Sequence, residues 1–203
     1  MTYYLKPRFA LPCIAGVLTL GLLSGVGTHM HALSSGKEIS IAAQGYDPRD
    51  ILLGHYVQLR ADLEFALTPE NAEEVRSDFD LERSANDLEG WIVLRNDESG
   101  WQPVSFHAEK PVLADKSTTV AIRTNAYAEE VHASDNDATV TLKIVPQLDI
   151  DRFYANQSEA LAIEERLRAS DADVRMILSV NASGEPLLKG VSVDGNRQVI
   201  SWW

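Results

Sequence analysis

Cysteine is almost absent from this chain of 203 residues, in which Cys13 is the only one. A single thiol cannot form a disulfide within the chain, and it cannot supply the cysteine pairs of a structural zinc site. Cys13 also lies inside an apolar run, directly after Leu11 and Pro12, whereas a lipidated cysteine would follow small residues. We therefore interpret this thiol as an apolar side chain without a chemical role.

Local motifs of several enzyme classes are also missing. The sequence has no Gly-x-Ser-x-Gly pattern around a nucleophilic serine, no phosphate-binding glycine loop, no His-Glu-x-x-His zinc motif and no EF-hand loop. No local pattern therefore indicates a reaction, and we predict neither a cofactor nor a metal site.

Positive charge is scarce as well. The chain has 18 Lys and Arg residues against 30 Asp and Glu residues, which gives a formal net charge of −12. An acidic surface repels the phosphates of nucleic acids, so DNA and RNA are excluded as partners. A cationic ligand is compatible with this charge, but a well-solvated surface explains it more simply.

What the chain does have is one long uncharged run near its N-terminus. Phe9 to Gly27 forms 19 positions without a charge, and a helix of that length is roughly 28 Å long, enough to cross a thin bilayer core. Lys6 and Arg8 lie in a short head, residues 1–8, and basic residues next to a membrane span stay in the cytoplasm. We therefore predict a transmembrane anchor over residues 9–27, with the rest of the chain outside the cytoplasm.

A cleaved signal peptide is the alternative interpretation of the same run. Gly25 and Gly27 are small enough for a cleavage site, but no Ala-x-Ala stands there and the run is longer than a usual signal core. The uncleaved anchor is therefore favoured. Residues 28–36 then form a polar connector, in which His29 and His31 are two positions apart and cannot share one helix face as metal ligands.

The clearest strand pattern follows a turn at Asp47-Pro48-Arg49-Asp50, whose proline and aspartates suit a type I turn. Gly54 marks a bulge or a positive φ angle after the turn. From His55 to Phe65 polar and apolar residues alternate strictly, and the apolar face consists of Val57, Leu59, Ala61, Leu63 and Phe65. This period of two predicts one half-buried antiparallel strand.

The same stretch carries a family resemblance. After the Asp-Pro-Arg-Asp turn come Gly54, Tyr56 and Leu59, and a second block lies at Ile150-Asp151-Arg152-Phe153-Tyr154. In this spacing, and over most of the chain, the sequence resembles the GDYXXLXY family of bacterial membrane-anchored proteins, with His55 and Ala61 replacing an acidic residue and a tyrosine of its pattern. The family is functionally obscure, so the resemblance implies an inner-membrane topology and a fold rather than an activity.

Further segments alternate in the same way. They predict strands at Lys37–Gln44, Trp91–Arg95, Trp101–His107, Thr118–Thr124, Ala138–Val145, Asp173–Val180, Pro186–Val193 and Arg197–Trp202. Two charged segments, Thr68–Glu89 and Glu129–Asp137, are interpreted as a surface excursion and a loop, and Pro146 is expected to end the strand before it.

Two segments predict helices. Thr68 is a suitable N-cap before Pro69, so a short helix is expected to run through Val75 or Arg76. The main helix is expected over residues 158–169. The predicted fold class is mainly β (α+β): an antiparallel β-rich domain over residues 37–203 with one main helix, preceded by the transmembrane helix.

The candidate ligand- or partner-binding residues come from the two blocks of the resemblance. They are Asp47, Arg49, Asp50, Gly54, His55, Tyr56, Phe153 and Tyr154. Simpler structural roles are available, since Arg49 can brace the turn and Phe153 can staple the entry of the following helix.

The leading hypothesis for function is a membrane-anchored extracytoplasmic binding or assembly module that docks on a polytopic membrane protein. An extracytoplasmic, peptidase-like hydrolase is one alternative. A metal-binding protein based on His55, His107 and His132 is another, although no two of these have the spacing of metal ligands. The sequence does not indicate an oligomeric state.

Overall fold

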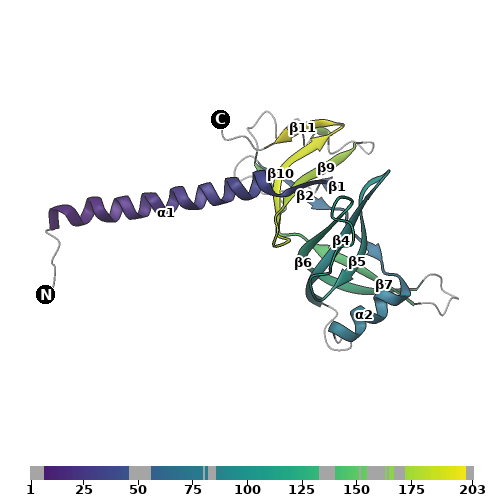
Figure 1. Ribbon diagram of the computed structural model, residues 1–203. Coiled ribbons are helices and arrows are strands. Elements are labelled where there is room, and N and C mark those ends of the chain that lie inside the picture. The colour runs from purple at the N-terminus through teal and green to yellow at the C-terminus, as the bar shows by residue number, and fades with distance from the viewer. Residues whose placement is uncertain are drawn as a thin grey trace.

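The computed structural model describes residues 7–45, 56–79, 81, 86–132, 140–150, 152–154, 163, 165–166 and 172–199. Within these ranges a long helix, α1 (Pro7–Ser35), projects away from a body of two antiparallel sheets, and α2 (Pro69–Phe79) lies on the second sheet, far from α1 (Figure 1). The prediction of a mainly β fold with antiparallel sheets and a long apolar N-terminal helix is confirmed.

The first sheet has six strands in the order β11-β10-β9-β1-β2-β8. Their bounds are β1 (Lys37–Gly45), β2 (Tyr56–Ala61), β8 (Arg152–Tyr154), β9 (Val174–Val180), β10 (Pro186–Val193) and β11 (Asn196–Val199). The second sheet has five strands in the order β3-β7-β6-β4-β5. Their bounds are β3 (Phe65–Ala66), β4 (Asn86–Asp97), β5 (Gly100–His107), β6 (Thr119–His132) and β7 (Val140–Gln147). Apolar side chains from both sheets form one continuous core.

Helix α1 is long, apolar and uncovered. From Leu11 to Ser35 it is long and apolar enough to cross a membrane, and its most apolar stretch has no residue buried against the rest of the chain. It also runs through residues 28–35, where the sequence predicts a polar connector. Residues 28–35 contain neither glycine nor proline, so no residue there breaks the helix.

The last turn of α1 is built into the first sheet. The Ser179 hydroxyl donates to the Ala32 carbonyl at 3.0 Å, and Leu33 is buried. Gly36 alone separates α1 from β1, and a Cβ atom at this position would lie 2.2 Å from the Ser179 Oγ. The helix and the sheet are therefore joined by a tight, packed corner.

The stretch predicted to be one strand from His55 to Phe65 is two strands in different sheets. β2 pairs with β1, where Ala61 is opposite Ala43, whereas β3 pairs with β7, where Phe65 is opposite Ile144. Leu59 and Leu63 are both buried, so the expected inward face is confirmed for these two residues. The chain crosses between the sheets at residues 62–64 without a change of period, because Leu63 still faces the shared core.

Helix α2 confirms its predicted start and corrects its surroundings. Pro69 is its first residue, and the amide of Ala72 donates to the carbonyl of Thr68 at 2.8 Å. The helix ends at Phe79, one turn later than expected. Asn71, Ala72 and Val75 are buried, so this part of the segment is packed on the sheet and is not a surface excursion.

Two charged segments belong to long strands. β4 begins at Asn86, not at Trp91, and β6 continues to His132, where the sequence predicts a loop from Glu129. Ala126 and Ala128 are buried, whereas Glu129 and Glu130 are exposed, so the charged end of β6 faces solvent while still paired as a strand.

Pro146 does not end β7, although the sequence predicts that it should. Pro146 is paired with Ala126 of β6. On its other side β7 is paired with β3 only at Lys143 and Ile144. A proline has no amide proton to donate, and here it lies beyond the described end of the second ladder, where no donor is required.

The predicted main helix over residues 158–169 lies largely outside the described residues. Ile163 is helical and buried, and residues 165–166 are helical.

Candidate functional site

The two sequence blocks singled out above meet in the first sheet. β2 and β8 are antiparallel neighbours, with Tyr56 opposite Tyr154 and Val57 opposite Phe153. Phe153 is buried in the core, which supports its structural role. The other candidates, Asp47, Arg49, Asp50, Gly54 and His55, lie outside the described residues. The backbone therefore brings together Tyr56, Phe153 and Tyr154 among the residues predicted from the sequence.

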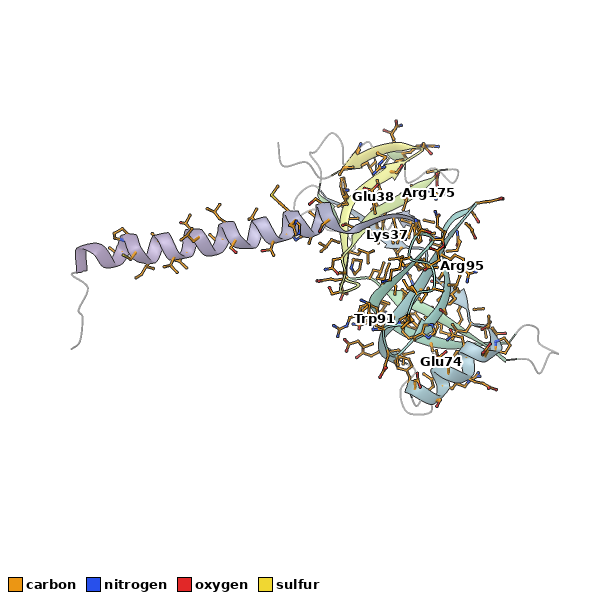
Figure 2. All side chains as sticks on the ribbon, in the orientation of Figure 1. Lys37, Glu38, Glu74, Trp91, Arg95 and Arg175 are labelled. Carbon is orange, nitrogen blue, oxygen red and sulfur yellow. The ribbon has the colours of Figure 1, made fainter. Side chains whose placement is uncertain are left out.

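A cavity that the sequence did not predict lies at the end of α1. It has a volume of about 610 Å³ and opens where Ser35, the segment 108–118 and the β9–β10 turn meet. The charged residues in its lining are Lys37, Lys110 and Lys116, and the described lining contains no carboxylate. We call this cavity the lysine pocket. Figure 2 shows Lys37 at the level where α1 enters the sheets, and Glu74 at the far end of the second sheet.

Lys37 forms the floor of the lysine pocket. Its ammonium group donates to the carbonyls of Lys116, Ser117 and Thr119 at 2.7, 2.9 and 3.0 Å. It also lies 4.7 Å from the centroid of the Trp101 ring. Burial lowers the pKa of Lys37, while the charge of Asp115 acts in the opposite direction. With three hydrogen bonds to backbone oxygens, Lys37 holds residues 116–119 against β1.

The other two lysines are at the rim of the pocket. Lys110 donates to the carbonyl of Ala182 at 2.7 Å, and its Nζ lies 5.2 Å from the centroid of the Trp91 ring. Lys116 is exposed, and its side chain has no hydrogen-bond or ion-pair partner among the described residues. The pocket thus has two cations that already bond the fold, Lys37 and Lys110, and a third, Lys116, that is available to a ligand.

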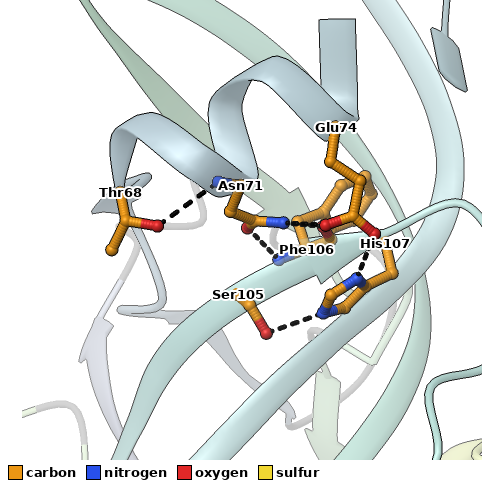
Figure 3. Close-up of polar contacts among 6 residues, drawn as sticks. All are labelled: Thr68, Asn71, Glu74, Ser105, Phe106 and His107. Atoms are coloured by element: carbon orange, nitrogen blue, oxygen red, sulfur yellow. Dashed lines mark hydrogen bonds and ion pairs between the residues drawn. The ribbon is translucent and has the colours of Figure 1, made fainter. Parts of the chain in front are cut away.

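A second polar cluster fastens α2 to the edge strand β5 (Figure 3). Glu74 Oε1 lies 2.9 Å from His107 Nδ1, and Ser105 Oγ lies 2.9 Å from His107 Nε2. The Asn71 side chain accepts from the Phe106 amide and donates to the Phe106 carbonyl, both at 2.9 Å. The hydrogen bond from His107 holds the pKa of the Glu74 carboxyl below its usual range; burial acts against it, and the hydrogen bond from Asn71 adds to the lowering.

Metal ligands are not gathered in the part of the chain that the structure describes. No group of three or more His, Cys, Asp or Glu side chains there could hold a metal ion. His107 contacts Glu74 and Ser105, and His55 lies outside this part of the chain.

A family model described as GDYXXLXY protein matches residues 18–191. The chain belongs to the GDYXXLXY family. Neither curated proteins nor solved structures give a match. The matched range contains the second half of α1 and the strands from β1 to β10, of which only the end of β10 lies outside it. Both blocks that meet at the β2–β8 pair are therefore included.

In this member of the GDYXXLXY family, an ionised Asp115 orders the turn at residues 115–118, next to the pocket residues Lys116 and Thr119. Its carboxylate accepts from the Ser117 amide and hydroxyl at 2.8 and 2.6 Å, and from the Thr118 hydroxyl at 2.7 Å. These bonds lower the pKa of Asp115 to about 2, from an ordinary value of 3.8. A depressed folded-state pKa means that its stabilising effect is complete above the ordinary value and is lost as the pH falls through the folded-state value.

We predict that the segment 115–119 loosens between about pH 4 and pH 2, the two ends of that titration. Hydrogen exchange of the Ser117 amide, followed against pH after correction for intrinsic exchange, measures this loosening. In Asp115→Asn the side chain can still accept but carries no charge, so this pH dependence should disappear. An equal pH dependence in the asparagine variant would contradict the assignment.

Proposed function

We propose that this protein is a single-pass inner-membrane protein of a bacterium, with residues 1–8 in the cytoplasm and residues 9–27 in the bilayer. The β-rich domain over residues 37–203 then lies in the periplasm and acts as a non-catalytic binding or assembly module. The observation that carries this proposal is the apolar helix α1, whose most apolar stretch has no residue buried against the rest of the described chain.

The exposure of α1 is too large for a helix in water. Leu11, Val17 and Leu22 are 76%, 70% and 73% exposed, and no atom of another part of the chain lies within 4 Å of a Cβ atom built at Gly16 or Gly21. Apolar patches of this extent mark contact with a membrane or with another protein. A bilayer covers a helix of this length on all sides, which matches exposure all round the helix.

Retention of the helix is supported by its C-terminal end. A signal peptidase cut near Gly25 or Gly27 would leave residues 28–35 as a free end, whereas Leu33 is buried and Ala32 accepts a hydrogen bond from Ser179. The family match also begins at residue 18, inside α1. The orientation rests on Lys6 and Arg8, which favour a cytoplasmic N-terminus.

Fractionation of cells that express the full chain tests the anchor. We expect the intact mass of the full chain in the membrane pellet after alkaline carbonate extraction, with a protease-sensitive domain in spheroplasts. Leu18→Arg combined with Leu22→Arg should abolish stable insertion, since each arginine costs roughly 3 kcal/mol at the centre of a span. Val199→Arg, at an exposed apolar position outside α1, is the matched control. A shortened soluble product from the unaltered chain would instead show a cleaved signal peptide.

The proposed partner is a polytopic membrane protein, and the proposed contact surface is the region where the two family blocks meet. Support comes from the β2–β8 pairing, which places the block containing Tyr56 beside the block containing Tyr154.

Purification in mild detergent should recover a membrane protein with the full chain. Arg49→Ala and Tyr56→Ala should each weaken this recovery without changing the melting temperature, whereas Arg95→Ala, exposed on β4, should leave it unchanged. Recovery of the chain alone in every mild detergent would contradict the proposal.

One observation favours a hydrolase as the second candidate. Glu74, His107 and Ser105 stand in the carboxylate–imidazole–hydroxyl order of a serine hydrolase triad, with 2.9 Å at each step. Such a site also requires donors for an oxyanion, and the amide of Phe106, between the serine and the histidine, already donates to Asn71. The cluster therefore supports attachment of α2 better than catalysis.

A serine–lysine pair is the other nucleophilic arrangement that the sequence allows, since Ser34 and Lys37 are three positions apart. Lys37 donates to three backbone carbonyls and is not free to act as a base. A fluorophosphonate probe decides both cases. Labelling of the unaltered chain that is lost in Ser105→Ala or Ser34→Ala would establish the hydrolase, and no labelling removes it.

A further inference from the structure

We propose that the lysine pocket binds the anionic headgroup of a phospholipid from the membrane in which α1 is anchored. This inference depends on the proposed anchoring and goes beyond it, because it assigns a ligand class to a site in the β-rich domain. Three independent features carry it: the sign of the charge in the pocket, the apolar tip at its rim, and its distance from the bilayer.

The charge of the lysine pocket is opposite to that of the chain. The formal net charge of the chain is −12, yet the charged residues of the described lining are all lysines. Lys37 supplies a fixed positive charge at the floor. Lys116 has an ammonium group without a partner among the described residues, so its donors remain available. A pocket of about 610 Å³ with these groups fits a phosphate-containing headgroup rather than a cation.

An apolar tip stands beside these cations. Val112 is 99% exposed, the highest value among the large exposed apolar side chains of the described chain, and Pro111 and Leu113 flank it in the lining of the pocket. An exposed apolar residue between Lys110 and Lys116 has the composition of a segment that lies at a lipid surface. Its apolar part would lie against the lipid surface while the ammonium groups meet the headgroups.

The position of the pocket brings it close to lipid. Ser35, the last residue of α1, lines the pocket, and the proposed span ends at Gly27. Eight further residues of helix add about 12 Å. The headgroup layer on each face of a bilayer is roughly 6 Å thick, so the pocket lies within about one Debye length of the headgroups.

Lipid titration of the full chain, purified in a neutral detergent, tests the proposal by native mass spectrometry. We expect one phosphatidylglycerol to be retained in preference to phosphatidylcholine. Lys110→Gln and Lys116→Gln should each weaken this retention about fivefold, since a lysine near an anionic lipid surface contributes about 1 kcal/mol. Lys189→Gln is the matched control, because Lys189 is paired with Glu38 outside the pocket. Unchanged retention in the Lys110 and Lys116 variants, or equal retention of both lipids, would overturn the proposal.

A competition arm separates a lipid from a soluble anion. Free glycerol phosphate should displace phosphatidylglycerol only at far higher concentration, because it lacks the acyl chains that Val112 would contact. Displacement at equal concentration would overturn the lipid assignment in favour of a free phosphate compound. Failure of the anchor is distinguished from both results, since a chain that has lost α1 is recognised by its intact mass in the same spectrum.

A depth measurement supplies a second readout. In a Cys13→Ser background, a spin label at Val112→Cys in nanodiscs should be more accessible to oxygen than one at Val199→Cys, an exposed position on β11. Equal aqueous exposure of the two labels would overturn contact of the tip with the lipid surface.

Discussion

Replacing Gly184 with alanine should lower the free energy of unfolding by about 2 to 4 kcal/mol. Gly184 has a φ angle of +82°, and a Cβ atom there would lie 2.1 Å from Cζ3 of Trp91. The positive φ angle costs about 1 kcal/mol for a residue with a side chain. The overlap with a rigid indole ring adds about 1 to 3 kcal/mol, because either the ring or the β9–β10 turn must move. Chemical denaturation of the full chain in detergent, followed by tryptophan fluorescence, measures the loss.

Gly195→Ala separates these two contributions. Gly195 has nearly the same φ angle, +81°, but no atom would lie within 4 Å of a methyl group at this position. We expect a loss of only about 1 kcal/mol from backbone strain. If both variants lost the same stability, the packing of Trp91 on the β9–β10 turn would not be responsible for the effect at Gly184.

Asn71→Ala should cost about 2 to 6 kcal/mol, which is large for a polar side chain. The Asn71 amide bonds both the amide and the carbonyl of Phe106, each at 2.9 Å, and Asn71 is only 6% exposed. Alanine would leave two buried backbone groups of an edge strand without partners, at about 1 to 3 kcal/mol for each. The loss is measured by denaturation as for Gly184, together with faster hydrogen exchange at the Phe106 amide.

Two variants make this prediction specific. Asn71→Asp keeps an acceptor for the Phe106 amide, but its second carboxylate oxygen would face the Phe106 carbonyl and the Glu74 carboxylate, to which Asn71 donates at 3.0 Å, so we expect a loss at least as large as that of alanine. Asn125→Ala, at an exposed position on β6, should change the free energy of unfolding by less than about 0.5 kcal/mol. Equal stability of Asn71→Ala and Asn125→Ala would show that α2 is held on β5 by other contacts.

Alternation in the sequence is a sound guide to which residues are buried and a poor guide to where strands begin and end. Leu59 and Leu63 are buried as predicted, but the same pattern does not reveal the crossing from the first sheet to the second at residues 62–64. Period two reports only which side of the chain faces the core. Since both sheets share one core, the period continues unchanged where the pairing partner changes.

Charge gives a wrong prediction of strand length. The acidic residues Glu129 and Glu130 favour a loop, whereas β6 extends through them to His132. Their neighbours Ala126 and Ala128 are buried, and alanine carries little strand signal of its own. Long-range pairing with β7 determines the end of this strand, and no local pattern shows that pairing.

The two candidate sites differ in how far the sequence could reveal them. The blocks around Tyr56 and Phe153 are recognisable locally, and the β2–β8 pairing brings them together. The lysine pocket could not be found in this way, because Lys37, Lys110 and Gly184 come from three distant segments. Only the fold shows that three lysines of an acidic chain converge.

The packed corner at Gly36 has a mechanical consequence. Under the proposed anchoring, a flexible tether would let the β-rich domain rotate freely above the bilayer, whereas the Ser179–Ala32 hydrogen bond and the buried Leu33 attach the end of the helix to the first sheet. A tilt of the helix within the membrane would then be transmitted to the first sheet, and a displacement of the sheet would be transmitted to the span.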